Sequence, residues 1–65
     1  MKGQAICDEL CRVFQLAGIG LNHLGYDSKI NKVEIVYQGR EPIYLELYDR
    51  NPELMVESIM KEVLR

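Results

Sequence analysis

The stretch that decides the fold is KVEIVYQGREPIYLELYD, residues 32–49. Apolar and polar side chains alternate on both sides of a turn at residues 38–42, and such alternation with β-branched and aromatic residues is typical of strands. A hairpin register with Lys32 opposite Glu46 keeps the apolar positions of both strands on one face. These positions are Val33, Ile35, Tyr37, Ile43, Leu45 and Leu47. The alternative register would place Glu34 opposite Glu46, a like-charge pair, so we predict the first one.

Helices are predicted on both sides of this hairpin. Apolar residues recur at helical spacing over residues 3–17, which predicts an amphipathic helix. Its predicted apolar face consists of Ile6, Leu10, Val13, Phe14, Ala17 and Leu21. A second helix is predicted to begin after Asn51, a good capping residue that is followed by Pro52 in the first turn. Its predicted buried stripe consists of Met55, Val56, Ile59, Met60 and Val63.

The segment between the first helix and the hairpin is GIGLNHLGYDSK, residues 18–29. Its three glycines predict a loop, and its apolar residues predict that the loop folds back on the core or holds a short helical turn. The predicted order is helix, strand, strand, helix. We therefore expect an α+β fold: one domain over residues 1–65, a small two-layer sandwich with an antiparallel hairpin packed against two helices.

The small size of the chain favours self-association. A domain of 65 residues buries only about 60% of the surface that its unfolded chain exposes. An isolated ribbon of two strands is marginally stable, and both of its edges are open to other strands. We therefore expect a homodimer in which two ribbons pair into a four-stranded sheet.

Composition and charge narrow the functional classes. The hydrophobic fraction is 48% and the charged fraction is 28%, as in ordinary folded domains. Charges interrupt every apolar run, so no transmembrane helix and no signal-peptide core is predicted, and we expect a cytoplasmic protein. The net charge of −2 is spread evenly along the chain, without the basic patch that nucleic-acid binding normally requires.

Two cysteines, Cys7 and Cys11, lie one helical turn apart in the sequence CDELC. With His23 they are the candidate metal ligands, but a zinc site needs about four ligands and a second half is missing. A catalytic triad would need a cysteine, His23 and Asp27, and no sequence feature brings these residues together. We therefore expect two packing residues, with Cys7 toward the core and Cys11 at its margin, no cofactor and no enzymatic activity.

Tyrosines supply the candidate interaction surface. Tyr44 and Tyr48 are predicted on the sheet face that points away from the helices, together with Val36, and Arg40 and Arg50 are close in sequence. Tyrosine and arginine are enriched in the cores of protein interfaces. The sequence thus favours a small non-enzymatic protein-interaction or adaptor module that self-associates through the hairpin or a helix face. A nucleic-acid accessory protein that uses the tyrosine face, and a metal or thiol protein that uses Cys7 and Cys11, are the alternatives.

Overall fold

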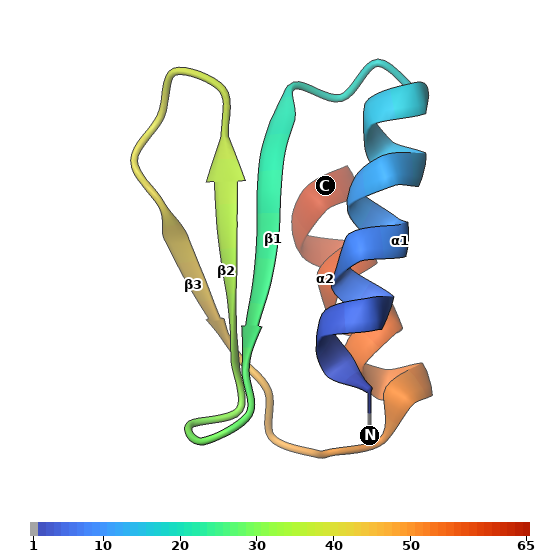
Figure 1. Cartoon of the computed structure of the whole chain (residues 1–65), viewed down its shortest axis with the longest axis vertical. Coiled ribbons are helices and arrows are strands. Elements are labelled where there is room, and N and C mark those ends of the chain that lie inside the picture. The colour runs from blue at the N-terminus through green and yellow to red at the C-terminus, as the bar shows by residue number, and fades with distance from the viewer. Residues whose placement is uncertain (1) are drawn as a thin grey trace.

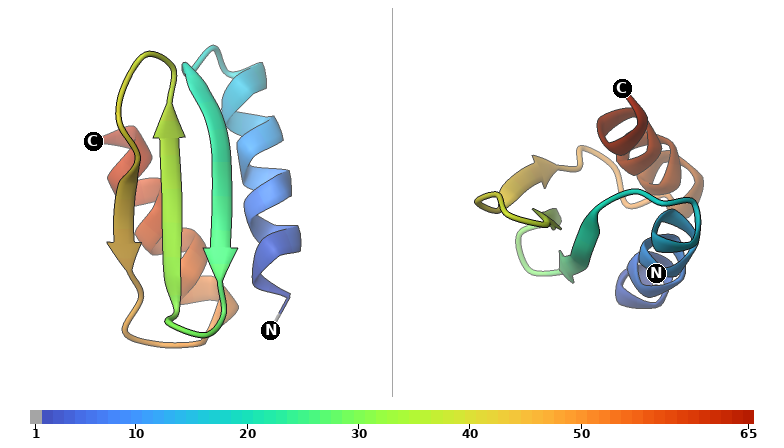
Figure 2. Two further views of the ribbon diagram at one scale, coloured as in Figure 1. Left: turned by 60° about the vertical axis from the view of Figure 1, so that its left-hand side comes forward. Right: turned by 90° about the horizontal axis from the view of Figure 1, so that it is seen from above.

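The computed structural model describes residues 2–65 and confirms an α+β fold of two layers. A three-stranded antiparallel sheet in the order β1-β2-β3 forms one layer, and two helices that cover one face of the sheet form the other (Figures 1 and 2). Along the chain the elements are α1 (Gly3–Leu16), β1 (Leu21–Asp27), β2 (Lys32–Tyr37), β3 (Ile43–Glu46) and α2 (Pro52–Leu64).

The hairpin and the second helix form as predicted. Lys32 lies opposite Glu46 in the β2–β3 ladder, and their charged ends, Nζ and Oε1, are 3.5 Å apart. The side chain of Asn51 caps α2 by accepting hydrogen bonds from the backbone N–H groups of Glu53 and Leu54. The cap satisfies two of the helix donors that would otherwise lack a partner, which fixes the start of α2.

The prediction for residues 18–29 was wrong in one respect, because most of this segment is the strand β1. Between Leu21 and His23 the pairing with β2 shifts by one residue, which is a β-bulge. The extra residue puts Leu21 and Leu24 on the same buried face although they are three positions apart. This spacing hides the period of two that identifies a strand. The sheet therefore has three strands, and the chain does not depend on an isolated two-stranded ribbon.

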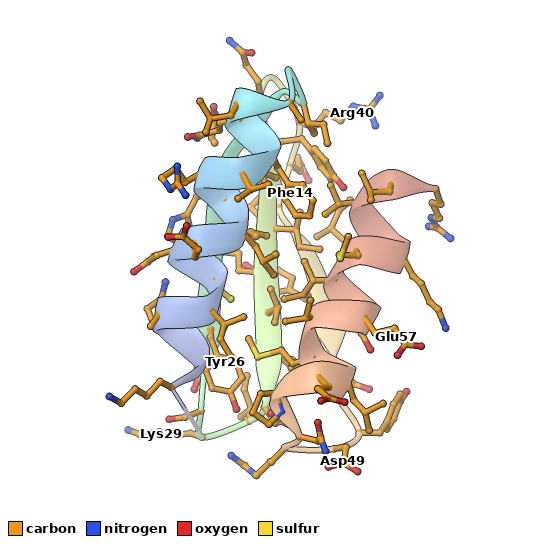
Figure 3. All side chains as sticks on the ribbon, turned by 90° about the vertical axis from the view of Figure 1, so that its right-hand side faces the viewer. Phe14, Tyr26, Lys29, Arg40, Asp49 and Glu57 are labelled. Atoms are coloured by element: carbon orange, nitrogen blue, oxygen red, sulfur yellow. The ribbon has the colours of Figure 1, made fainter. Side chains whose placement is uncertain are left out.

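The core lies between the sheet and the two helices, where Phe14 points inward (Figure 3). It consists of Cys7, Phe14, Leu21, Leu24, Val33, Ile35, Leu47, Met55 and Ile59. Val13 and Met60 were predicted to be buried but are 45% and 39% exposed. The buried line of α1 runs instead through Gly3, Cys7 and Phe14, since only one narrow side of each helix meets the sheet.

One end of the molecule is held together by a polar contact between three segments. The hydroxyl of Tyr26 on β1 donates to Asn31 Oδ1 at 2.7 Å, and Asn31 Nδ2 donates to the carbonyl of Leu47 at 2.8 Å and to that of Asp49 at 3.2 Å. Asn31 has a φ of 52°, a left-handed conformation that asparagine tolerates better than most residues. A β-carbon on Gly3 would lie 2.3 Å from the Tyr26 ring, so only glycine lets α1 begin there.

Neither helix is long and apolar enough to span a bilayer within the part of the chain that the structure describes.

Candidate functional site

The outer edge of β1 is closed by side chains of α1. The amide of Gln4 donates from Nε2 to the carbonyl of Leu24 at 3.2 Å and accepts at Oε1 from the N–H of Tyr26 at 2.8 Å. Gln15 donates from Nε2 to the carbonyl of Leu21 at 2.9 Å. The Gln4 amide thus makes the two hydrogen bonds that a peptide group of a neighbouring strand would make. An incoming strand would have to displace it.

Helix geometry explains why these two glutamines reach the same strand. Residues eleven positions apart on an α-helix lie within about 20° of each other around its axis, so Gln4 and Gln15 share one line along α1. Cys11 lies on the same line between them and is partly buried against the core. Cys11 therefore lies at the margin where α1 meets β1, as its position on the helix predicts.

Within the described part of the chain, the outer edge of β3 has no such cover. The N–H of Leu47 bonds to the carbonyl of Asn31 at 3.0 Å, which shows that odd-numbered residues of this segment direct their backbone groups toward β2. Backbone groups alternate along a strand, so Tyr44 and Glu46 direct their N–H and C=O groups outward. The hydrogen bonds among residues 2–65 include none to these outward groups, and β3 is the last strand of the sheet (Figure 2). Pro42 also points outward in this alternation and has no N–H.

A groove of about 360 Å³ runs beside this open edge, between β3 and α2. It is lined by Leu45, Glu46, Tyr48, Ser58, Lys61, Glu62 and Arg65. The charged residues have both signs and sum to zero, and two of them already pair along the helix, with Arg65 Nε 3.0 Å from Glu62 Oε2. The lining of the groove therefore combines apolar Leu45 with charged residues whose charges balance.

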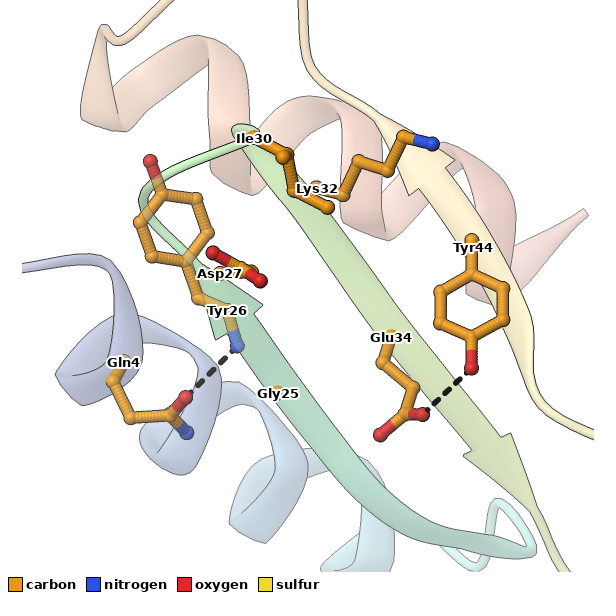
Figure 4. Close-up of a pocket in the computed structure, with 8 residues that line it drawn as sticks. All are labelled: Gln4, Gly25, Tyr26, Asp27, Ile30, Lys32, Glu34 and Tyr44. Carbon is orange, nitrogen blue, oxygen red and sulfur yellow. Dashed lines mark hydrogen bonds between the residues drawn. The ribbon is translucent and has the colours of Figure 1, made fainter.

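The sheet face that the helices leave open holds a second hollow, of about 280 Å³ (Figure 4). Gly25 forms its base, and the Tyr44 hydroxyl donates to Glu34 Oε2 at 3.1 Å across it. This hydrogen bond and the charge of Glu34 raise the pKa of Tyr44. The imidazole of His23 lies over Gly25, because a β-carbon there would be 2.8 Å from His23 Nε2. With Asp27 also in its lining, the hollow carries more carboxylates than cations.

The residues predicted as an interaction surface do not form one patch. Tyr44 and Val36 share the open face, since Tyr44 pairs with Glu34 two residues from Val36. Tyr48 is 94% exposed and lines the groove beside α2 instead. Arg40 lies where β2 turns into β3, whereas Arg50 follows Asp49 at the opposite end of the sheet (Figure 3). The structure thus brings Tyr44 together with Val36 and separates the other three.

The candidate metal and catalytic residues also lie apart. Cys7 is fully buried between α1 and the sheet, and burial, with smaller contributions from Asp8 and Cys11, raises the pKa of its thiol to about 11. His23 and Asp27 lie on the opposite, open face of the sheet. Among residues 2–65 no three histidine, cysteine or acidic side chains cluster as a metal site would require, and both cysteines are free. A thiol that stays protonated at neutral pH is a poor nucleophile and a poor metal ligand.

Two residues that close the β1 edge, Gln4 and Gln15, were not predicted from the sequence. Both look like ordinary polar positions on the exposed side of a helix. Their spacing of eleven was the available signal, because it aligns two amides that can each hydrogen-bond backbone groups. This spacing indicates hydrogen bonds to a strand only when β1 is known to be a strand beside α1.

Comparison with known proteins finds no matching family model, no similar curated protein and no similar solved structure. The function is therefore inferred from the geometry of this chain.

Proposed function

We propose that this chain is a small non-enzymatic protein-interaction module that binds an extended segment of its partner at the free edge of β3. The observation that carries the proposal is the difference between the two edges of the sheet. The side chain of Gln4 on α1 hydrogen-bonds the outward carbonyl of Leu24 and the outward N–H of Tyr26, whereas no group among residues 2–65 hydrogen-bonds the outward groups of Tyr44 and Glu46. Such a sheet accepts a further strand only at its open edge, because side chains of α1 cover the other edge.

The surroundings of β3 suit strand addition. The main-chain groups of Tyr44 and Glu46 supply affinity without regard to sequence, and side-chain contacts on the two faces of the added strand supply specificity. Alternate side chains of the added strand would face the groove beside α2 and the open sheet face that carries Tyr44. Both faces offer an aromatic ring, Tyr48 in the groove and Tyr44 on the open face. Tyrosines of this kind commonly anchor protein interfaces.

The two alternative functions have less support. Tyr44 is exposed enough to stack on a nucleic-acid base, but Glu34, Asp27 and Glu46 lie on the same side of the sheet and repel phosphate. A metal or thiol role would have to use a cysteine that is buried in the core, or Cys11 at the α1–β1 margin, without a further ligand nearby. The strand-binding role uses groups that the structure leaves free.

The free thiols of Cys7 and Cys11 also support a reducing compartment, so we propose a cytoplasmic location. Cell fractionation tests it, and recovery from an oxidising compartment with either thiol in a disulfide would contradict it.

A substitution that removes one outward N–H tests the binding edge. Glu46→Pro deletes the outward N–H without touching the ladder to β2, and Glu46→Ala is the matched control that keeps the N–H and removes the same side chain. We would select a random-peptide phage library on immobilised protein of each kind. Peptides enriched on the wild type should bind Glu46→Ala equally and lose about tenfold or more in affinity on Glu46→Pro.

The same experiment can overturn the proposal. Selected peptides that bind Glu46→Pro as well as Glu46→Ala would show that binding occurs elsewhere on the surface. A library that yields no enriched peptide, together with no self-association of the wild type, would show that the edge is not a binding element.

A further inference from the structure

We propose that the occupant of the open edge is a second copy of this chain, whose β3 pairs antiparallel with β3 about a two-fold axis at Leu45. The proposal rests on the proposed function, because it names the partner for the same edge. Each chain contributes three strands, so pairing at this edge gives a continuous sheet of six strands with all four helices on one face. The register of this pairing follows from the backbone of β3.

The two faces of β3 restrict the possible registers. Ile43 and Leu45 face the helices, while Tyr44 and Glu46 face the open side. Residues directly opposite each other in an antiparallel pair share a face. A register that slips by one residue would place Leu45 opposite Tyr44 and put the apolar row against solvent. Only registers that pair odd with odd and even with even residues keep the core face continuous.

Four such registers are centred on residues of β3, and one satisfies the edge completely. Pairing Ile43 with Ile43 of the second copy places Tyr44 opposite Pro42, which has no N–H to donate, so the carbonyl of Tyr44 stays without a partner. Pairing Glu46 with Glu46 of the second copy places like charges opposite each other, which is destabilising. Pairing Tyr44 with Tyr44 places Glu46 opposite Pro42, which has no N–H to donate, so the carbonyl of Glu46 stays without a partner. Pairing Tyr44 with Glu46 of the second copy, and Glu46 with its Tyr44, gives four hydrogen bonds that use all outward groups of both residues.

The surface around the β3 edge is self-complementary, so that it fits the same surface of a second copy. In this register Leu45 lies opposite Leu45 at the axis, and Ile43, which is 38% exposed, lies opposite Leu47 of the second copy. The groove along β3 carries two acidic residues, Glu46 and Glu62, and two basic residues of α2. A patch of one sign would repel its own copy, whereas a patch with balanced charges can pair with itself across a two-fold axis.

Disulfide trapping with two variants that each expose one introduced cysteine tests the register. Tyr44→Cys and Glu46→Cys are made separately, each with Cys11→Ser, while Cys7 stays because it is fully buried. Opposed residues in a hydrogen-bonded pair have α-carbons about 5.5 Å apart, which suits a disulfide. One of the two chains is labelled with ¹⁵N, the chains are mixed under oxidised glutathione, and mass spectrometry separates mixed from unmixed dimers.

The proposed register predicts mixed dimers in about tenfold excess over either unmixed dimer. Only in mixed dimers do the two introduced cysteines lie directly opposite each other, at a distance that a disulfide can span. Unmixed Tyr44→Cys dimers in excess would show the register centred on Tyr44 and overturn the proposed one. Unmixed Glu46→Cys dimers in excess would overturn it in favour of the register centred on Glu46. From equal amounts of the two chains, mixed dimers at only about twice either unmixed dimer would show random collision and overturn the paired edge.

Light scattering on unmodified chains provides the second measurement. Glu46→Pro removes two hydrogen bonds from the symmetric dimer and should weaken it about 30-fold, whereas Glu46→Ala should change it by less than about threefold. A wild-type chain that stays monomeric at high micromolar concentration overturns the second copy as the occupant. If such a monomer still selects peptides that Glu46→Pro fails to bind, strand binding stands and only the self-pairing fails.

Discussion

The two outer edges of the sheet differ in whether their outward backbone groups have hydrogen-bond partners. Along β1, α1 lies close enough for the amide of Gln4 to hydrogen-bond Leu24 and Tyr26, so the edge ends in a side chain that imitates a strand. Along β3, the outward groups of Tyr44 and Glu46 have no hydrogen-bond partner among residues 2–65, and α2 borders only the groove beside them. A helix that covers a sheet therefore protects an edge only when its line of polar side chains points at that edge.

Replacing Asn31 should give the largest effect, because it joins the ends of both edges. Asn31→Ala loses the hydrogen bonds to Tyr26, Leu47 and Asp49 and leaves alanine in a left-handed conformation. We expect the free energy of unfolding to fall by about 2–4 kcal/mol in urea titrations. Asn31→Gly is the matched control, since it tolerates the positive φ and loses only the side chain. If both variants kept wild-type stability, the polar contact would not hold the two edges together.

Raising the pH should loosen the closed edge through Cys7, which packs α1 onto the sheet. The pKa of this thiol is about 11 in the folded chain, against 9.0 as its ordinary value. Below about pH 9 both states keep the proton, and between the two values only the unfolded chain releases it, so stability falls as pH rises. From about pH 8 to about pH 11 the wild type should lose about 2 kcal/mol more than Cys7→Ala. Parallel losses in urea titrations of the two proteins would contradict this assignment.

Opening the β1 edge directly should have a moderate effect. Gln4→Leu removes both hydrogen bonds to the strand, which we expect to lower the free energy of unfolding by about 1–2 kcal/mol and to speed amide exchange at Tyr26. Gln4→Glu is a graded control, because it can still accept from Tyr26 but cannot donate to Leu24. An unchanged exchange rate at Tyr26 in Gln4→Leu would mean that the glutamine does not close the edge.

The smallest effect on folding should come from Glu46→Pro in dilute solution. Since its N–H points outward, the monomer loses only the exposed contact with Lys32, worth under about 0.5 kcal/mol, and Glu46→Ala should lose the same. Thermal unfolding of both variants at low concentration measures this. A much larger loss in the proline variant would show that Glu46 donates within the folded chain and that the edge is not free.

Much of the fold could be predicted from the sequence because local chemistry specified it. The hairpin register followed from the charges of Lys32 and Glu46, and the start of α2 followed from the capping geometry of Asn51. The strand β1 could not be predicted because its bulge replaces alternation with a three-residue spacing between Leu21 and Leu24. A bulge is recognisable only against the partner strand, which a single segment does not contain.

The difference between the two sheet edges was harder to predict than the fold. Size and open strand edges predict self-association through the hairpin or a helix face, and Tyr44 and Tyr48 are predicted to share a recognition face, but these two tyrosines line different hollows. What distinguishes one edge from the other is the reach of Gln4, whose amide hydrogen-bonds Leu24 and Tyr26. That reach depends on how α1 lies along β1, which is a tertiary property.

The meander order of the sheet also has a kinetic consequence. Each pair of neighbouring strands is consecutive in the chain and joined by a short turn, and α1 packs on the strand that directly follows it. Contacts between segments close in sequence cost little loop entropy, so such chains fold faster than sheets built from distant segments. Strands that pair early within their own chain are exposed to strands of other chains for only a short time during folding. The β3 edge is then the edge that stays open after folding is complete.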